Sequence, residues 1–149
     1  PAALENQITD ETAPLLQAKI VAEAANGPTT SEGDRILREK GIFVIPDILC
    51  NSGGVTVSYF EWVQNAMHYY WSEEEVNEKL AAKMRQAFET VYRMHVEHRV
   101  DMRTAAYMVG VSRLAEALFA RGWIKKKSPR RGIDFFDLHD VSVNCFPIH

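Results

Sequence analysis

The sequence predicts an α/β fold in which a partial Rossmann-like parallel sheet is followed by long carboxy-terminal helices. Two short apolar segments, residues 19–24 and 42–46, are separated by a segment with capping residues at its start and a glycine at its end. A strand, a helix and a second strand over this distance form a βαβ unit, whose strands are parallel and whose crossover is right-handed. From residue 59 onward, apolar residues recur at helical spacing.

Local chemistry indicates each element of the βαβ unit. Capping residues and acids at residues 9–12 precede two leucines and predict a short helix. The apolar run 19–24 is short and nearly continuous, which predicts a buried strand. Hydroxyls at residues 29–31 can cap the helix that follows, and Gly41 can end it. The run 42–46 is the second predicted strand.

Three helices are predicted in the second half of the chain. The aromatic-rich segment from Tyr59 to Trp71 predicts a buried helix. Ser72 and Glu75 are spaced as a capping box, which begins the next helix. That helix carries an apolar stripe made of Val76, Leu80, Met84, Ala87, Val91 and Met94. Asp101 can cap the last helix and Gly122 can end it. Its predicted apolar stripe is Tyr107, Val111, Leu114 and Leu118.

Composition excludes several classes of function. The chain has 149 residues, of which 46% are hydrophobic, and a formal net charge of −3, so it can form a core and nothing indicates a nucleic-acid partner. No apolar run reaches the roughly 18 residues that a membrane span needs. Cys50 and Cys145 are too few for a disulfide framework and are typical of a reducing compartment. We therefore expect a cytoplasmic protein with neither a membrane nor a nucleic-acid partner.

The charge balance and the helical periodicity of the sequence change after Trp123, which divides the chain into residues 1–123 and 124–149. Residues 1–124 carry 12 basic and 17 acidic side chains, whereas the remainder carries five and three and has little helical periodicity. We expect the second part to be a flexible tail or a sequence foreign to the domain; an added strand or a subunit-contact arm are the alternatives. The first residues follow on as though a strand had just ended, and we interpret the chain as a fragment of a longer protein or a processed product.

The best candidates for ligand binding follow the two predicted strands. Asn26 and Asn51 come after the first and second strand, and in an open parallel sheet ligands bind beyond the carboxyl ends of the strands. An asparagine amide offers two donors and an acceptor, which match a carboxamide such as that of nicotinamide. Gly53 and Gly54 would let the backbone approach a ligand closely. The alternative is a structural asparagine in a turn or a helix cap.

Ser58 and Val55 lie shortly after this glycine pair and share a helix face. A hydroxyl at this place can bind a carboxylate, or it can be satisfied by the carbonyl four residues back. Of the five histidines, those at positions 68, 95 and 98 match metal-ligand spacing only loosely. His95 and His98 lack acidic or cysteine partners at ligand spacing beyond Glu97, so we predict no metal site.

Several blocks occur together in one order, and in that order they resemble the hexameric glutamate dehydrogenases, members of the Glu/Leu/Phe/Val dehydrogenase family. The blocks include AANGPTT at 24–30, NSGGVTVSYFEW at 51–62 and DMRTAAY at 101–107, with shorter matches at 2–7 and 45–47. The resemblance covers residues 1 to about 123. It implies that this part is the carboxy-terminal portion of a Rossmann-type NAD(P)-binding domain.

The resemblance also implies an activity, oxidative deamination of L-glutamate to 2-oxoglutarate and ammonia with hydride transfer to NAD or NADP, in a homo-hexamer. The implied cofactor-binding residues are Ala2, Ala3, Asn26 and Asn51. Val55 matches a residue that lines the substrate pocket, and Ser58 matches the hydroxyl that helps to bind the side-chain carboxylate. The catalytic lysines and aspartate of the family lie in an amino-terminal domain, so no catalytic residue is expected in this chain.

Two departures from the family pattern limit what this chain can do. It has no Gly-x-Gly-x-x-Gly loop and no lysine-bearing domain, so we expect it to be inactive in isolation. The choice between NAD and NADP is left open. One alternative is a non-catalytic truncated homologue or regulatory interaction module. Another is a dehydrogenase of a branched-chain or aromatic amino acid, although Ser58 favours glutamate because a buried hydroxyl would be unpaired against an apolar side chain.

Overall fold

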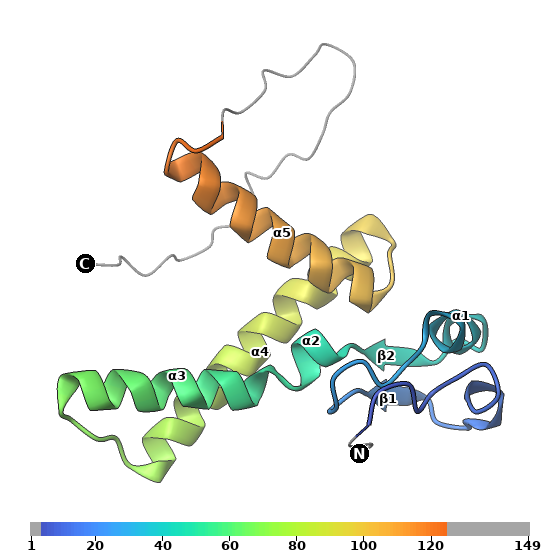
Figure 1. Ribbon diagram of the computed structural model, residues 1–149, viewed down its shortest axis with the longest axis horizontal. Helices are drawn as coiled ribbons and strands as arrows, with labels where there is room; N and C mark the ends of the chain where they lie inside the picture. Colours follow the sequence, from blue (N-terminus) through green and yellow to red (C-terminus); the bar gives the residue numbers. More distant parts are fainter. Residues whose placement is uncertain (1–3, 125–149) are drawn as a thin grey trace. The chain divides into compact units, whose positions relative to one another are not determined.

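The computed structural model describes residues 4–124, which fall into two compact units divided between Leu114 and Ala115. Figure 1 shows the labelled helices and strands of these residues. The elements in chain order are η1 (Ala13–Leu15), β1 (Ile20–Ala22), α1 (Ser31–Glu39), β2 (Phe43–Ile45), α2 (Asp47–Cys50), α3 (Ser52–Met67), α4 (Glu73–His98) and α5 (Met102–Ala120). This order confirms the predicted βαβ unit followed by long helices. None of the described helices is long and apolar enough to cross a membrane.

The two strands are parallel and α1 connects them. Val21 of β1 lies opposite Val44 of β2 in the register. The predicted cap of α1 is present, because the Thr30 hydroxyl accepts a hydrogen bond from the Gly33 amide at 3.0 Å. The helix ends as predicted before Gly41, whose φ of 70° is in the left-handed region that glycine tolerates.

The prediction of a buried first strand is wrong for part of β1. The Ile20 side chain is 58% exposed, and of the three residues of β1 only Val21 is partly covered. A continuous apolar run is typical of a strand covered on both faces. Within residues 4–124 the sheet has two strands, and α1 with η1 covers one face through a cluster of Ala13, Leu37 and Ile42.

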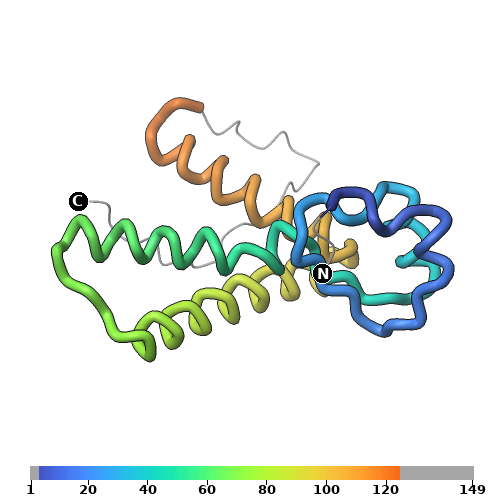
Figure 2. Tube along the Cα trace, turned by 60° about the horizontal axis from the view of Figure 1, so that its bottom comes forward, coloured from blue at the N-terminus to red at the C-terminus, as the bar shows by residue number. Residues whose placement is uncertain are grey.

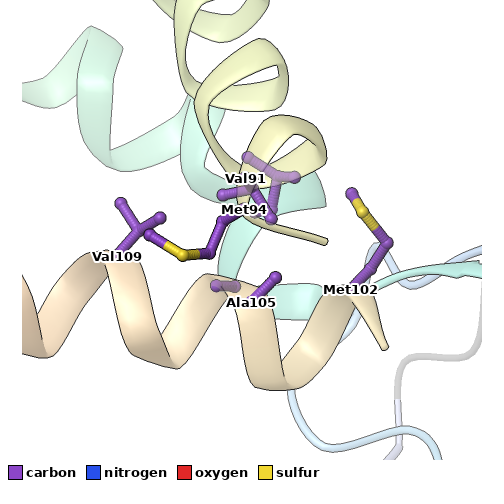
Figure 3. Close-up of a cluster of buried hydrophobic side chains, with 7 residues drawn as sticks. Val91, Met94, Met102, Ala105 and Val109 are labelled. Atoms are coloured by element: carbon purple, nitrogen blue, oxygen red, sulfur yellow. The ribbon is translucent and has the colours of Figure 1, made fainter. Parts of the chain in front are cut away.

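A second hydrophobic cluster joins α2, α4 and α5. Figure 3 shows Val91 and Met94 of α4 beside Met102, Ala105 and Val109 of α5. Leu49 of α2 and the partly buried Phe43 and Ile45 of β2 pack against the same cluster. This cluster therefore holds the sheet against the amino-terminal part of α5.

Helices α3 and α4 pack against each other as a hairpin. Figure 2 shows them as two long helical stretches joined by a loop. The capping box of α4 is confirmed in full: Ser72 Oγ accepts from the Glu75 amide at 3.2 Å, and Glu75 Oε2 accepts from the Ser72 amide at 2.8 Å. Trp71 closes the turn by packing edge-on against Phe60, with ring centroids 5.7 Å apart.

The aromatic helix is not buried as predicted. It begins at Ser52, and of its residues only Phe60 is buried, whereas Tyr59 and Trp62 are 59% and 64% exposed. Beyond its junction with α2, helix α3 contacts mainly α4. Because α3 carries apolar residues on several faces, most of these faces are left exposed within the described residues.

The predicted stripe of α4 is confirmed, and that of α5 is wrong for three of its four residues. Val91 and Met94 are buried, and the other four residues of the α4 stripe are half-buried. On α5, Tyr107, Val111 and Leu114 are 56–64% exposed. The buried face consists instead of Met102, Ala105, Ala106 and Val109. The two alanines belong to the buried cluster that contains Val91 and Met94 of α4, which a ranking by side-chain size does not anticipate.

Both predicted ends of α5 are confirmed. Asp101 Oδ1 accepts the Thr104 amide at 2.9 Å and Oδ2 accepts its hydroxyl at 2.7 Å. Burial opposes ionisation of Asp101, but these bonds and the charge of Arg38 outweigh it and lower its pKa. In the second unit Gly122 has a φ of 69°, and the Trp123 amide donates to the Leu118 carbonyl at 3.0 Å. The predicted tail lies, after Ile124, outside the described residues.

Ser72→Ala should lower the free energy of unfolding of the chain by about 1 kcal/mol, because it removes the acceptor that caps α4. Urea denaturation followed by circular dichroism measures the change. Ser58→Ala is the matched control: the Ser58 side chain is exposed within α3 and makes no hydrogen bond in the described residues, so the change should stay within about 0.5 kcal/mol. Equal effects of the two substitutions would contradict the capping role.

Candidate functional site

The loops that follow the two strands meet at the carboxyl edge of the sheet. Asn51 Nδ2 donates a hydrogen bond of 2.6 Å to Asn26 Oδ1. Asn26 is exposed and Asn51 is half-buried. The expectation that both asparagines emerge at the same edge is therefore confirmed, and the two side chains form a pair.

The asparagine pair keeps unused hydrogen-bonding groups. The bond between them uses one N–H of Asn51 and one lone pair of Asn26. The amino group of Asn26 and the carbonyl oxygen of Asn51 remain, so the pair can donate to and accept from a single ligand. This combination of a donor and an acceptor fits a carboxamide.

A buried acid lies at the same end of β1. Glu23, the residue after β1, is only 2% exposed. Its Oε1 accepts from the Thr29 hydroxyl at 2.6 Å and from Arg103 Nη2 at 2.7 Å, and its Oε2 accepts from the Asp47 amide at 2.9 Å. Burial of a carboxylate is tolerated only where such bonds replace water.

Arg103 is surrounded by three carboxylates. Besides Glu23, its guanidinium reaches Asp34 at 3.3 Å and Asp47 at 3.4 Å. Burial of Arg103 disfavours its charged form, but the hydrogen bond and charge of Glu23, with the charge of Asp34, outweigh burial and raise the pKa of the guanidinium. It stays a cation at every relevant pH.

Asp47 connects this cluster to the loop that carries Asn26. Its Oδ2 accepts the Gly27 amide at 2.8 Å, and its Oδ1 accepts the Ile48 amide at the start of α2. Gly27 has a φ of 53°, which a residue with a side chain rarely adopts. The tight turn after Asn26 is thus anchored on the residue that begins the helix leading to Asn51.

No sequence pattern indicated Glu23, Asp47 or Arg103 as site residues. Glu23 is a single acid at the end of an apolar run, and Arg103 is a cation in the first turn of a helix, where the helix dipole disfavours positive charge. Each is a weak local anomaly, and their pairing becomes visible only in three dimensions.

Val55 and Ser58 lie on an exposed face of α3. Val55 is 70% exposed, and within residues 4–124 the Ser58 hydroxyl makes no hydrogen bond. The alternative in which Ser58 bonds the carbonyl four residues back is not observed; Thr56 makes that kind of bond, to the Ser52 carbonyl at 2.8 Å. Seven residues of helical rise place Ser58 about 10 Å along α3 from Asn51. The hydroxyl is free to meet a ligand.

The glycine pair in the first turn of α3 leaves room beside the asparagines. A Cβ added to Gly54 would meet no atom within 4 Å, and one added to Gly53 would make only ordinary contacts with Leu80 and Met84. Packing inside the described residues therefore does not require glycine here. Ala2 and Ala3, the other cofactor-binding candidates, lie outside the described residues.

A separate groove of about 510 Å³ lies between the amino end of β2 and the junction of α4 and α5. Its lining includes Ile42, Phe43, Val44, His95, Val100 and Met102. Two of its three arginines, Arg38 and Arg103, are already paired with carboxylates. In the described part of the chain no three His, Cys, Asp or Glu side chains could hold a metal ion. The sheet edge is the stronger candidate for ligand binding, because the Asn26–Asn51 pair leaves a donor and an acceptor unused there.

Comparison with known proteins gives a consistent set of relatives. The sequence profile of the Glutamate/Leucine/Phenylalanine/Valine dehydrogenase family matches residues 1–122. The chain is 59% identical over 123 residues to the NAD-specific glutamate dehydrogenase of Staphylococcus aureus, covering 83% of this chain and 30% of that protein. It is likewise 59% identical over 124 residues to a catabolic NAD-specific glutamate dehydrogenase of Bacillus subtilis, covering 83% and 29%.

Solved structures agree with the sequence matches. The crystal structure of glutamate dehydrogenase from Peptoniphilus asaccharolyticus superposes with a TM-score of 0.80 at 54% identity, covering 83% of this chain and 31% of that one. The hetero-hexameric glutamate dehydrogenase of Thermus thermophilus gives 0.78 at 34% identity, covering 84% and 30%. L-Tryptophan dehydrogenase from Nostoc punctiforme gives 0.61 at 27% identity, covering 76% and 32%. The chain thus spans about 30% of the length of the glutamate dehydrogenases of Staphylococcus aureus and Peptoniphilus asaccharolyticus.

Glu23→Ala should destabilise the chain by about 3–5 kcal/mol, because it leaves the part-buried donors of Thr29 and Asp47 without an acceptor and Arg103 without its nearest partner. Glu32→Ala is the matched control, since Glu32 bonds Arg35 on the exposed face of α1 and should cost less than about 1 kcal/mol. Chemical denaturation of both variants measures the difference. Similar losses would show that Glu23 contributes no more than a surface ion pair.

Proposed function

Because the chain belongs to the Glutamate/Leucine/Phenylalanine/Valine dehydrogenase family, we propose that it is the carboxy-terminal part of the nicotinamide-binding domain of an NAD-dependent glutamate dehydrogenase. The complete enzyme would convert L-glutamate, water and the oxidised cofactor to 2-oxoglutarate, ammonium, the reduced cofactor and a proton. Support comes from the high identity to two NAD-specific glutamate dehydrogenases. These relatives favour NAD, and none of them favours NADP.

The observation that carries the proposal is the Asn26–Asn51 pair at the carboxyl edge of the parallel sheet. Its free amino group and carbonyl oxygen match the carboxamide of nicotinamide, and ligands of open α/β sheets bind at this edge. Ala2 and Ala3 would line the dinucleotide beyond the pair. When bound, the nicotinamide ring supplies the hydride acceptor. The role of the two asparagines is to fix the orientation of that ring, which decides which face meets the substrate.

Ser58 and Val55 would serve the other ligand. The Ser58 hydroxyl, exposed and without a hydrogen-bond partner among residues 4–124, can donate to the distal carboxylate of glutamate. Val55 lies three residues away on the same face and can contact the methylene groups of the same side chain. Both follow Asn51 on one helix, so α3 would connect the cofactor and substrate subsites.

The remaining machinery would come from the rest of a longer polypeptide. The pyrophosphate-binding glycine loop and the lysines that polarise the carbonyl do not occur in this sequence as recognisable motifs. The chain spans about 30% of the relatives that it matches, which leaves room for both. We also propose a hexameric assembly, because one relative is hetero-hexameric and because α3 and α5 leave aromatic and aliphatic side chains exposed.

The isolated 149-residue chain should show no glutamate dehydrogenase activity and should bind NAD with a dissociation constant above about 10 μM, or weaker than about −7 kcal/mol. The asparagine pair alone cannot replace a helix amino terminus against the pyrophosphate. An absorbance assay at 340 nm, against a blank without protein, measures turnover, and titration calorimetry measures binding. Turnover above the blank, or tight binding, would mean that the chain is a functional unit of a different kind.

Ser58→Val in the complete enzyme should lower kcat/KM for glutamate about 10- to 150-fold, the equivalent of one charge-assisted hydrogen bond. Leucine and norvaline should be used equally well or better, since valine removes an unpaired hydroxyl from their path. Steady-state kinetics on these substrates decide the matter. Equal losses on all of them would assign Ser58 a structural role, and a wild-type preference for an apolar amino acid would favour the alternative substrate class.

A further inference from the structure

We propose that Arg103, in the first turn of α5, is a positioning residue for the Asn26–Asn51 pair and hence for the cofactor. The inference rests on the proposed function only for its last step, the binding of the nicotinamide by the pair. Its earlier steps concern contacts within one compact unit, residues 1–114.

Arg103 acts on the pair through two carboxylates. Its Nη2 bonds Glu23 Oε1 at 2.7 Å, and its Nη1 lies 3.4 Å from Asp47 Oδ1. Those acids in turn hold the loop that carries Asn26: Glu23 accepts the Thr29 hydroxyl and Asp47 accepts the Gly27 amide. The loop is therefore bonded at two places, Gly27 and Thr29, which both follow Asn26 closely.

The same two carboxylates fix the other asparagine. Glu23 Oε2 accepts the amide of Asp47, the first residue of α2, and Asp47 Oδ1 accepts the amide of Ile48. Helix α2 ends at Cys50, so its position sets that of Asn51. The Arg103 guanidinium thus bonds both acids that hold the segments of Asn26 and Asn51, although it makes no hydrogen bond to either asparagine.

Charge explains why an arginine is needed. Glu23, Asp34 and Asp47 surround Arg103 within 3.4 Å, and the Glu23 side chain is completely buried. Without the cation, three negative groups would face one another, and like charges at this range repel strongly. The planar fork of arginine reaches all three, which the single ammonium of lysine does not do with the same geometry.

The location of Arg103 indicates that it does more than stabilise its own helix. It lies two residues after the N-cap Asp101, where a positive charge is unfavourable to the helix dipole. Arg35 of α1, by contrast, pairs with Glu32 and Glu39 on an exposed helix face and touches neither loop. Arg35 is therefore a matched control for the loss of a paired arginine.

The test compares Arg103→Met, Arg103→Lys and Arg35→Met in the complete dehydrogenase polypeptide that carries this segment. Arg103→Met should raise the KM for NAD about tenfold or more and lower kcat, because the ring loses its orientation, while the KM for glutamate changes less than about threefold. Arg103→Lys should recover part of the loss, and Arg35→Met should change nothing. No change in the KM for NAD, or parallel losses in all three constants, would overturn the proposal. If Arg103→Met does not fold, the same selective rise is required of Arg103→Lys.

Hydrogen exchange separates this proposal from the proposed function. The Gly27 amide, bonded to Asp47, should exchange at least tenfold faster in Arg103→Met than in Arg35→Met if Arg103 positions the loop. Unchanged protection of Gly27 would overturn the positioning role whatever the kinetics. Asn51→Ala tests the cofactor contact itself. If Asn51→Ala leaves the KM for NAD unaltered while Arg103→Met exposes Gly27, the positioning stands and the cofactor assignment fails.

Discussion

The buried ion pair between Glu23 and Arg103 is the interaction on which the arrangement of the sheet edge depends. A carboxylate that is 2% exposed is costly unless each of its oxygens is satisfied. Here a hydroxyl, a backbone amide and a guanidinium satisfy them, and these come from three separate parts of the chain. The ion pair stabilises the fold only when all three donors bond Glu23. It therefore requires the ends of both strands and the start of α5 to be in place together.

This constraint distinguishes the two halves of the candidate site. The asparagine pair lies on loops that are hydrogen-bonded to the charged cluster of Glu23, Asp47 and Arg103. Its geometry is therefore set before a ligand binds. Ser58 and Val55 lie on a helix that contacts mainly α4 and exposes most of its surface. Preorganisation of that kind suits the orientation of a cofactor ring, which must be precise. The substrate half would become enclosed only by further protein.

The exposed apolar faces fit a chain that represents about 30% of its relatives. Tyr59 and Trp62 on α3, and Tyr107 and Val111 on α5, are all more than half exposed. Aromatic and aliphatic side chains at helical spacing are typical of surfaces that another part of a protein covers. In the proposed enzyme these faces would meet the remaining polypeptide or neighbouring subunits, and the substrate cleft would form there.

The sequence by itself determined the elements whose causes are local. The Ser72–Glu75 capping box, the Thr30 and Asp101 caps and the glycine-ended helices depend on residues within a few positions of one another. The meeting of Asn26 and Asn51 followed from the rule that parallel strands end at one edge. Only the tertiary structure decided that α5 buries its alanines and exposes Tyr107, and that Glu23 pairs with a residue 80 positions away. Both outcomes are set by contacts between distant segments, which no local pattern of hydrophobicity or charge encodes.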